Sequence, residues 1–397
     1  MHTIPPLNAL LDVPLPALAS GRGPLTGETL AVKDIFDVAG MVTGGGNPQK
    51  AAESPPATHT APAIQMLLDN GAKLAGKSQT DEFAFSLLGQ NAHFPHPVNP
   101  AAPDRVTGGS SSGSVSAVAG GLVTIAAGSD TGGSIRAPAS FCGLPGLRTT
   151  HGRITLEGAL PLAPSLDVFG WFAKDIALYE KVGAVLLGAD AQDFKLTRPL
   201  FIPLLEHFLI GEAEDAAYRK MYATVCAHLG QARSARQPTA SMDDLYLCFR
   251  QIQGFEVWQA HGAWIAAKDR GLGPGVRERF EYSSKIDRAT YDTQTRRRDL
   301  FRSELGDLLR DDGVLILPTV PGAAPLTAAA FDDLQTYRER MLHLLCLSPL
   351  SGFPQITLPL GEVHGAPFGI SLLGPKNSDR ALIRLGRAIL GTSPRAI

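Results

Sequence analysis

The sequence has little cysteine and no concentrated metal-binding motif. Only four cysteines occur among 397 residues. They are scattered, with no CxxC pair and no short His/Cys spacing: Cys142, Cys226, Cys248 and Cys346. Disulfide frameworks and zinc sites need paired or closely spaced ligands, so neither is expected here. We expect neither a metal nor an organic cofactor, and unpaired thiols fit a reducing, cytoplasmic location.

The chain also lacks a basic excess and a long apolar run. Lys and Arg number 36 against 38 Asp and Glu, which gives a net charge of −2 at pH 7. Nucleic acids and anionic membranes attract basic surfaces, so neither is expected as a partner. No segment reaches the roughly 18 apolar residues of a membrane-spanning helix. The N-terminal stretch MHTIPPLNALLDVPLP has no charged start followed by an apolar core, so it does not read as a signal peptide.

What the sequence does contain is enough apolar material for a large core. Hydrophobic residues make up 44% and charged residues 19%, which is typical of a globular protein. Strand-like and helix-like segments alternate: strands at 30–38, 73–77 and 122–127, and helices at 61–70 and 114–121. This order predicts an α/β fold with a mixed central β-sheet flanked by helices. We expect one domain over 1–397, with a mainly helical section at about 210–312 and a closing β-hairpin near 352–374.

Residues 107–138, TGGSSSGSVSAVAGGLVTIAAGSDTGGSIRAP, hold seven serines. A flexible linker would not contain the apolar run VTIAAG. A phosphate-binding loop needs the pattern GxxxxGK[ST], and this stretch has no lysine. The segment GSSSG matches the GxSxG elbow of serine esterases, but a proline-rich loop precedes it where that motif requires a strand. The esterase hypothesis also lacks a local signature for its acid and histidine.

Three elements in order resemble the amidase signature family. They are AVKDIFDV at 31–38, GGSSSGS at 108–114 and GSDTGGSIRAPAS at 128–140. The resemblance runs over about 25–177 and returns weakly near 352–374. It implies the α/β/α sandwich of that family and hydrolysis of a carbon–nitrogen amide bond. The stretches NAHFPHPVNP and TGETLAVKDIFDVAGMVTGGGNP look most like indole-3-acetamide hydrolase-type amidases, which implies a small primary amide with an aryl- or indolyl-alkyl group.

The resemblance also assigns roles to individual positions. It implies the nucleophile at Ser134, a bridging serine on a cis peptide bond at Ser110, the catalytic lysine at Lys33, an oxyanion site from the backbone N–H groups of Thr131, Gly132, Gly133 and Ser134, and supporting charges at Asp130 and Arg136. The sequence departs from the pattern at Ser112, where many members have glycine. The other serines of the stretch are interpreted as loop or helix-cap groups: Ser111, Ser112, Ser114, Ser116 and Ser129.

The implied triad is chemically reasonable for an amide. An amide is a poor electrophile with a poor leaving group, so its hydrolysis needs an activated nucleophile, an oxyanion site and an acid. The motifs contain no histidine, and a buried neutral lysine is the base that remains. Burial lowers the pKa of a lysine because the charged form loses hydration. Lys33 lies in an apolar segment that suits this role.

Several alternatives stay open at this point. An allophanate or carboxybiuret-type hydrolase would need a cationic group placed for the carboxylate of its substrate. A transamidase subunit would pass ammonia to a partner, and a non-catalytic scaffold would have no need to retain Lys33, Ser110 and Ser134 together. The partner that we expect is a small-molecule amide substrate. A homodimer is a further expectation.

Overall fold

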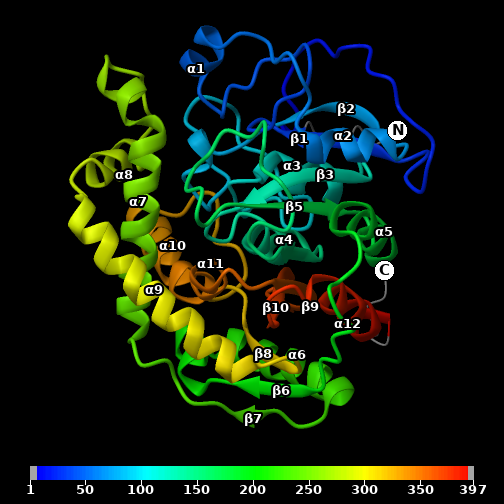
Figure 1. Ribbon diagram of the computed structural model, residues 1–397, viewed down its shortest axis with the longest axis vertical. Coiled ribbons are helices and arrows are strands. Elements are labelled where there is room, and N and C mark those ends of the chain that lie inside the picture. The colour runs from blue at the N-terminus through cyan, green and yellow to red at the C-terminus, as the bar shows by residue number, and fades with distance from the viewer. Residues whose placement is uncertain (1–6, 392–397) are drawn as a thin grey trace.

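The computed structural model describes residues 7–391. Its first sheet has the order β2–β1–β3–β5 (Figure 1). The strands of this sheet are β1 (Thr29–Lys33), β2 (Lys73–Ser78), β3 (Ile125–Asp130) and β5 (Val168–Ala173). Strand β1 pairs in parallel with β2 and β3, whereas β3 pairs antiparallel with β5. The sheet is therefore mixed, and its parallel part contains the two strands that carry the sequence motifs.

The second sheet has the order β4–β9–β10–β8–β6–β7. Its strands are β4 (Gly146–Arg148), β6 (Arg198–Phe201), β7 (Arg233–Ser234), β8 (Gly313–Pro318), β9 (Gln355–Val363) and β10 (Ala366–Leu373). Strands β9 and β10 form the antiparallel hairpin that was expected near 352–374. Both sheets combine parallel and antiparallel pairs, so the predicted α/β class with mixed β-structure is confirmed.

Helices cover the sheets and fill the space between them. Those in the layers around the sheets are α1 (Pro48–Glu53), α2 (Pro62–Asp69), α3 (Ser112–Ala119), α4 (Arg136–Cys142), α5 (Ile176–Leu187), α11 (Leu347–Ser351) and α12 (Asp379–Gly391), with the short 3-10 turns η1 (Glu82–Ala84) and η2 (Pro203–Phe208). Helix α4 packs on β9 and β10, and α12 packs on α5 and β9. The chain thus interleaves helices and sheets as the sequence predicted.

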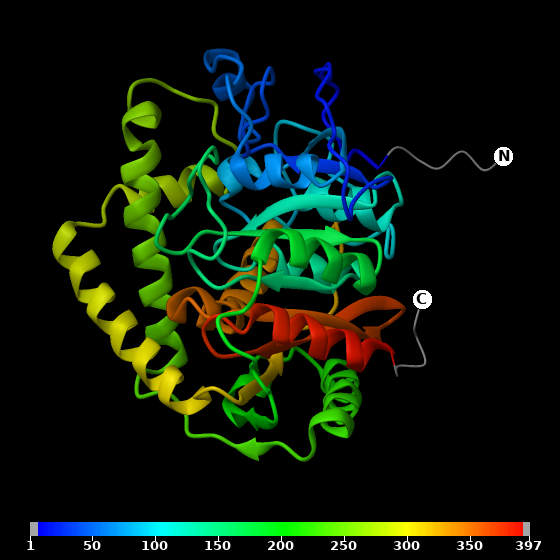
Figure 2. The same cartoon turned by 45° about the vertical axis from the view of Figure 1, so that its right-hand side comes forward.

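Helices make up most of the charged central section. It contains α6 (Glu212–Leu229), α7 (Met242–Ala266), α8 (Val276–Ser283) and α9 (Arg288–Leu309), and α10 (Phe331–Leu345) follows it. Side-chain caps begin two of these helices, since Ser241 accepts a hydrogen bond from Asp244 N–H and Asp287 accepts one from Thr290 N–H. Both views show α7 and α9 standing together on one side of the sheets (Figures 1 and 2).

The structure corrects two strand boundaries, and both corrections concern the site. The strand predicted over 30–38 ends at Lys33, because the N–H groups of Ile35 and Phe36 both turn back to the Lys33 carbonyl. The strand predicted from residue 122 begins at Ile125 and runs on to Asp130. Because β1 and β3 are parallel, their carboxyl ends lie at one edge of the sheet, where α/β proteins build sites.

Within residues 7–391, no helix is both long enough and apolar enough to cross a bilayer.

Candidate active site

Lys33 is fully buried at the end of β1 and is held by two hydroxyl groups. Its Nζ donates to Ser110 Oγ at 2.8 Å and to Ser129 Oγ at 2.9 Å. Burial lowers the pKa of Lys33 to about 7, although the negative charges of Asp81, Asp167 and Asp130 act in the opposite direction. A substantial share of this amine is therefore neutral near pH 7, and a neutral amine can accept a proton.

Ser110 lies just before α3 and is fully buried. The peptide bond between Gly109 and Ser110 is cis. The backbone is anchored on both sides of this bond, because Gly109 N–H donates to the Leu87 carbonyl at 2.8 Å and Asp81 N–H donates to the Ser110 carbonyl at 3.1 Å. These contacts hold the Ser110 hydroxyl toward Lys33.

Ser134 lies in the loop that connects β3 to α4. It is 3% exposed and borders a small pocket together with Thr131 and Gly132. The loop needs its two glycines, since Gly133 has a φ of +125° and a Cβ on Gly132 would lie 2.5 Å from Phe249 Cζ. In the described part of the chain, the Ser134 hydroxyl makes no hydrogen bond, so it is unengaged at the wall of the pocket.

Asp130 organises the loop that carries Ser134. Its buried carboxylate accepts hydrogen bonds from Gly133 N–H at 2.9 Å and Ile135 N–H at 3.2 Å, and from Arg136 Nε at 3.0 Å. Burial acts to raise the pKa of Asp130, but Arg136 and Arg148 outweigh it and hold this pKa well below its usual range. The carboxylate therefore stays ionised and fixes the turn of the loop.

The hydrogen bond from Gly133 N–H to the Asp130 carboxylate changes the predicted oxyanion site. Gly133 N–H was expected to face the developing oxyanion, but it is engaged by Asp130. The backbone N–H groups of Thr131, Gly132 and Ser134 make no hydrogen bond within residues 7–391. Three of the four predicted donors thus remain available.

The sequence interpretation missed three side chains of the site. Ser129 was interpreted as a loop or cap group, but it belongs to β3 and accepts from Lys33. Arg148 is fully buried and pairs with the carboxylate of Asp130. Asp167 accepts a hydrogen bond from Thr131 Oγ1 and others from the backbone at 162 and 163. Only Ser129 had a sequence signal, because it lies inside the GSDTGGSIR motif.

Asp81 is a fourth missed residue, and it packs directly against the cis peptide. A Cβ on Gly109 would lie 2.2 Å from Asp81 Oδ2, so any other residue at this position would displace the Asp81 carboxylate. Burial raises the pKa of Asp81, while hydrogen bonds from Gly89 N–H and the Ser112 hydroxyl act against that rise.

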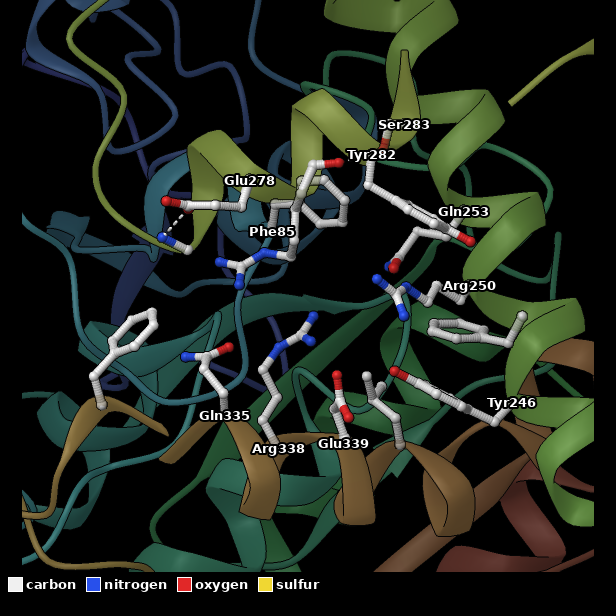
Figure 3. Close-up of a pocket in the computed structure, with 15 residues that line it drawn as sticks. Phe85, Tyr246, Arg250, Gln253, Glu278, Tyr282, Ser283, Gln335, Arg338 and Glu339 are labelled. Atoms are coloured by element: carbon white, nitrogen blue, oxygen red, sulfur yellow. Dashed lines mark hydrogen bonds between the residues drawn. The ribbon is translucent and has the colours of Figure 1, made fainter. Parts of the chain in front are cut away.

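Two larger pockets adjoin the small pocket at Ser134. One, of about 260 Å³, is drawn in Figure 3 and lies between α7, α8 and α10. It shares four lining residues with the small pocket at Ser134: Phe85, Gln253, Arg338 and Leu342. The other, of about 180 Å³, has Ser129, Thr131 and Asp167 on one wall and mostly apolar side chains elsewhere. A bound molecule could extend from Ser134 into either space.

Comparisons with known proteins agree on the family. The family model described as Amidase matches residues 15–216 and 217–383. Amidase 1 of Oryza sativa subsp. japonica is 36% identical over 94% of this chain and 92% of its own length. A crystal structure of an amidase has a TM-score of 0.82 and 30% identity, covering 92% of this chain and 84% of that one. A Kluyveromyces lactis allophanate hydrolase also has a TM-score of 0.82, with 26% identity over 93% of this chain and 62% of its own.

These matches span nearly the whole described chain rather than the motifs alone. They support a hydrolase of carbon–nitrogen amide bonds, in agreement with the sequence prediction of an amidohydrolase. The chain therefore belongs to the amidase family.

Proposed function

We propose that the chain hydrolyses a small primary amide through an acyl-enzyme on Ser134. The observation that carries this proposal is the buried contact of 2.8 Å between Lys33 Nζ and Ser110 Oγ. In the proposed first step, Ser134 Oγ attacks the amide carbonyl and gives its proton to Ser110, while the Ser110 proton passes to neutral Lys33. The C–O bond forms and the carbonyl π electrons move to the oxygen, which becomes an oxyanion.

The oxyanion would be stabilised by the N–H groups of Thr131, Gly132 and Ser134. When the tetrahedral intermediate collapses, the C–N bond breaks and the proton held by Lys33 returns through Ser110 to the nitrogen, which leaves as ammonia. A water molecule then attacks the ester by the same route. It releases the carboxylic acid and restores the Ser134 hydroxyl.

The substrate expectation of an aryl- or indolyl-alkyl amide is also a proposal. The pocket of about 180 Å³ supports it, because apolar side chains form most of its walls, among them Ile35, Leu156, Leu160 and Leu162. An aromatic group in this space would place its amide beside Thr131, at the start of the loop that carries Ser134. The homodimer and the cytoplasmic location stay predictions from the sequence.

Among the alternatives, the allophanate-type reaction has a specific observation in its favour, which is the arginine-rich wall of the larger pocket. The transamidase and scaffold hypotheses differ from the proposal in a simple way. A transamidase subunit would show ammonia transfer that depends on a stoichiometric partner, and a scaffold would show no turnover. The purified chain alone is expected to release ammonia.

The test is an ammonia assay on a panel of aliphatic, aryl and indolyl primary amides and carboxylated ureas, combined with mass spectrometry of acid-quenched enzyme. We expect turnover of at least one amide and a mass increase equal to its acyl group on the peptide that contains Ser134. If ammonia is released but no such adduct is found, and hydroxylamine captures no acyl group from the enzyme, the acyl-enzyme is contradicted. Absence of ammonia from the entire panel would contradict the hydrolase.

A further inference from the structure

Arg338 on α10 is a buried cation without a counterion. The residue is 9% exposed, and its Nε is buried without a hydrogen-bond partner. Within residues 7–391, its guanidinium group makes neither a hydrogen bond nor an ion pair. A buried charge is costly unless it is paired, so an unpaired arginine at a pocket wall points to an anion that binds there.

Two other arginines approach the same space. Arg279 on α8 also has a buried Nε without a partner, and its guanidinium carbon lies 5.5 Å from the centroid of the Phe85 ring. Arg250 on α7 stacks over Tyr282 at 4.1 Å. Figure 3 shows the guanidinium groups of Arg250 and Arg338 pointing into the pocket from different helices.

Within residues 7–391, the acids near the pocket form no ion pair with these cations, although the charge of Asp81 acts on both Arg338 and Arg279. Glu278 accepts a hydrogen bond from Gly275 N–H at the start of α8, and Glu339 is exposed and forms no ion pair in the described structure. Burial lowers the pKa of Arg338 and of Arg279. The charge of Arg250 adds to the decrease for Arg338, and the charge of Arg338 adds to the decrease for Arg279, while nearby acids act against both. An anion between the arginines would relieve both effects.

We propose that this pocket binds a carboxylate group carried by the amide substrate, with Arg338 as its main contact. The inference rests on the proposed hydrolysis at Ser134, because Arg338 lines both the small pocket at Ser134 and the larger one. A carboxylate held by Arg338 would therefore lie beside the pocket where the amide carbonyl meets Ser134. The substrate class is the monoamide of a short dicarboxylic acid, and a planar guanidinium suits its two oxygen atoms.

The first test compares turnover of matched amides. Succinamate carries a carboxylate where butyramide carries a methyl group, and 4-carboxyphenylacetamide is matched in the same way by phenylacetamide. We expect kcat/KM to be at least about tenfold higher for the carboxylated member of each pair. In Arg338→Gln this ratio of the two kcat/KM values should fall most of the way to one. The exposed Arg277 on α8 provides a control, since Arg277→Gln removes the same charge outside this pocket. Equal rates for matched amides, or an unchanged ratio in Arg338→Gln, would overturn the inference.

A second test measures binding without turnover. In a Ser134→Ala background, calorimetry should show succinamate binding at least about tenfold more tightly than butyramide, and the additional Arg338→Gln change should abolish the difference. This arm separates the two proposals. If the parent enzyme hydrolyses neutral and carboxylated amides equally well, only the carboxylate site is refuted. If Ser134→Ala binds succinamate selectively but the parent enzyme releases no ammonia from any amide, only the hydrolase is refuted. Thermal unfolding of each variant checks that the fold is intact.

Discussion

Lys33 Nζ lies 2.8 Å from Ser110 Oγ, although the two residues are 77 positions apart in the chain. The contact forms because β1 ends at Lys33 and the anchored peptide before α3 presents Ser110 at the same edge of the sheet. Both side chains are fully buried, so the hydrogen bond is shielded from water. The proposed proton path therefore depends on how the sheet is assembled, and it can be tested residue by residue.

Replacing Ser134 with alanine removes the proposed nucleophile. We expect Ser134→Ala to reduce kcat for ammonia release by at least about 1,000-fold, because the variant lacks the hydroxyl proposed to form the acyl-enzyme. The thermal midpoint should change little, since this hydroxyl makes no hydrogen bond in the described structure. Exposed Ser284 serves as a control, and Ser284→Ala should keep full activity. Substantial activity in Ser134→Ala would reject the assignment.

The pH dependence of the reaction should report the state of Lys33. Burial lowers the pKa of Lys33 to about 7, and only the neutral amine can accept a proton. We therefore expect kcat/KM to rise with pH through about 7 and to level off above it. The measurement is kcat/KM from pH 5 to 9 in buffers of constant ionic strength. A profile that falls over this range would be incompatible with Lys33 as the base.

The lowered pKa of Lys33 also predicts how the stability of the protein depends on pH. The pKa of Lys33 is about 7 in the folded chain and 10.5 in its ordinary state, so the unfolded chain binds more protons between these values. The contribution of Lys33 to the free energy of unfolding must then increase as pH rises from 7 to 10.5. In Lys33→Met this contribution disappears. Urea unfolding of both proteins at pH 7 and pH 9.5 measures it, and an identical pH response in the two would show that Lys33 does not titrate as proposed.

Asp130 should be required for the stability of the nucleophile loop. Asp130→Asn leaves Arg136 and Arg148 buried without their anion, and breaking such a buried pair costs about 3–5 kcal/mol. Urea unfolding at pH 7 measures the loss, and Asp311→Asn at an exposed position is the matched control. Because the folded pKa is lowered, the contribution of Asp130 should be present above its ordinary value of 3.8 and fade only as pH falls below it. A loss below about 1 kcal/mol would show that the arginines find other partners.

Ser129 should act on the reaction through the position of Lys33. Ser129→Ala removes one of the two hydroxyl groups that accept hydrogen bonds from Lys33 Nζ, so the amine is held less well toward Ser110. We expect kcat to fall by about tenfold, as for the loss of one hydrogen bond to a charged group, with a displaced midpoint in the pH profile. Ser116→Ala, in the same stretch but hydrogen-bonded to the Val98 carbonyl, should leave that midpoint in place. An unaltered pH profile in Ser129→Ala would assign Ser129 a purely structural role.

The sequence was sufficient for features that are local or carried by a motif. The fold class and the hairpin near the C-terminus followed from periodicity, and the motifs brought Lys33, Ser110 and Ser134 together as candidates. The contact of Ser129 with Lys33 could not be predicted, because it depends on the pairing register of β1 with β3. The burial of Arg338 could not be predicted either. Arg338 lies in a charged amphipathic helix, where an arginine is usually solvated, and the packing of α10 against its neighbours, α7 among them, buries it.

The location of α7, α8 and α10 has a consequence for how this protein can change. The residues proposed for chemistry all lie within 33–134, whereas most of the larger pocket's wall comes from 246–342. Bond cleavage and the proposed binding of a carboxylate are thus encoded in separate stretches of the chain. Substitutions in the wall can redirect the protein to another amide while the cleavage machinery stays intact, so new specificities can arise in this chain without an inactive intermediate.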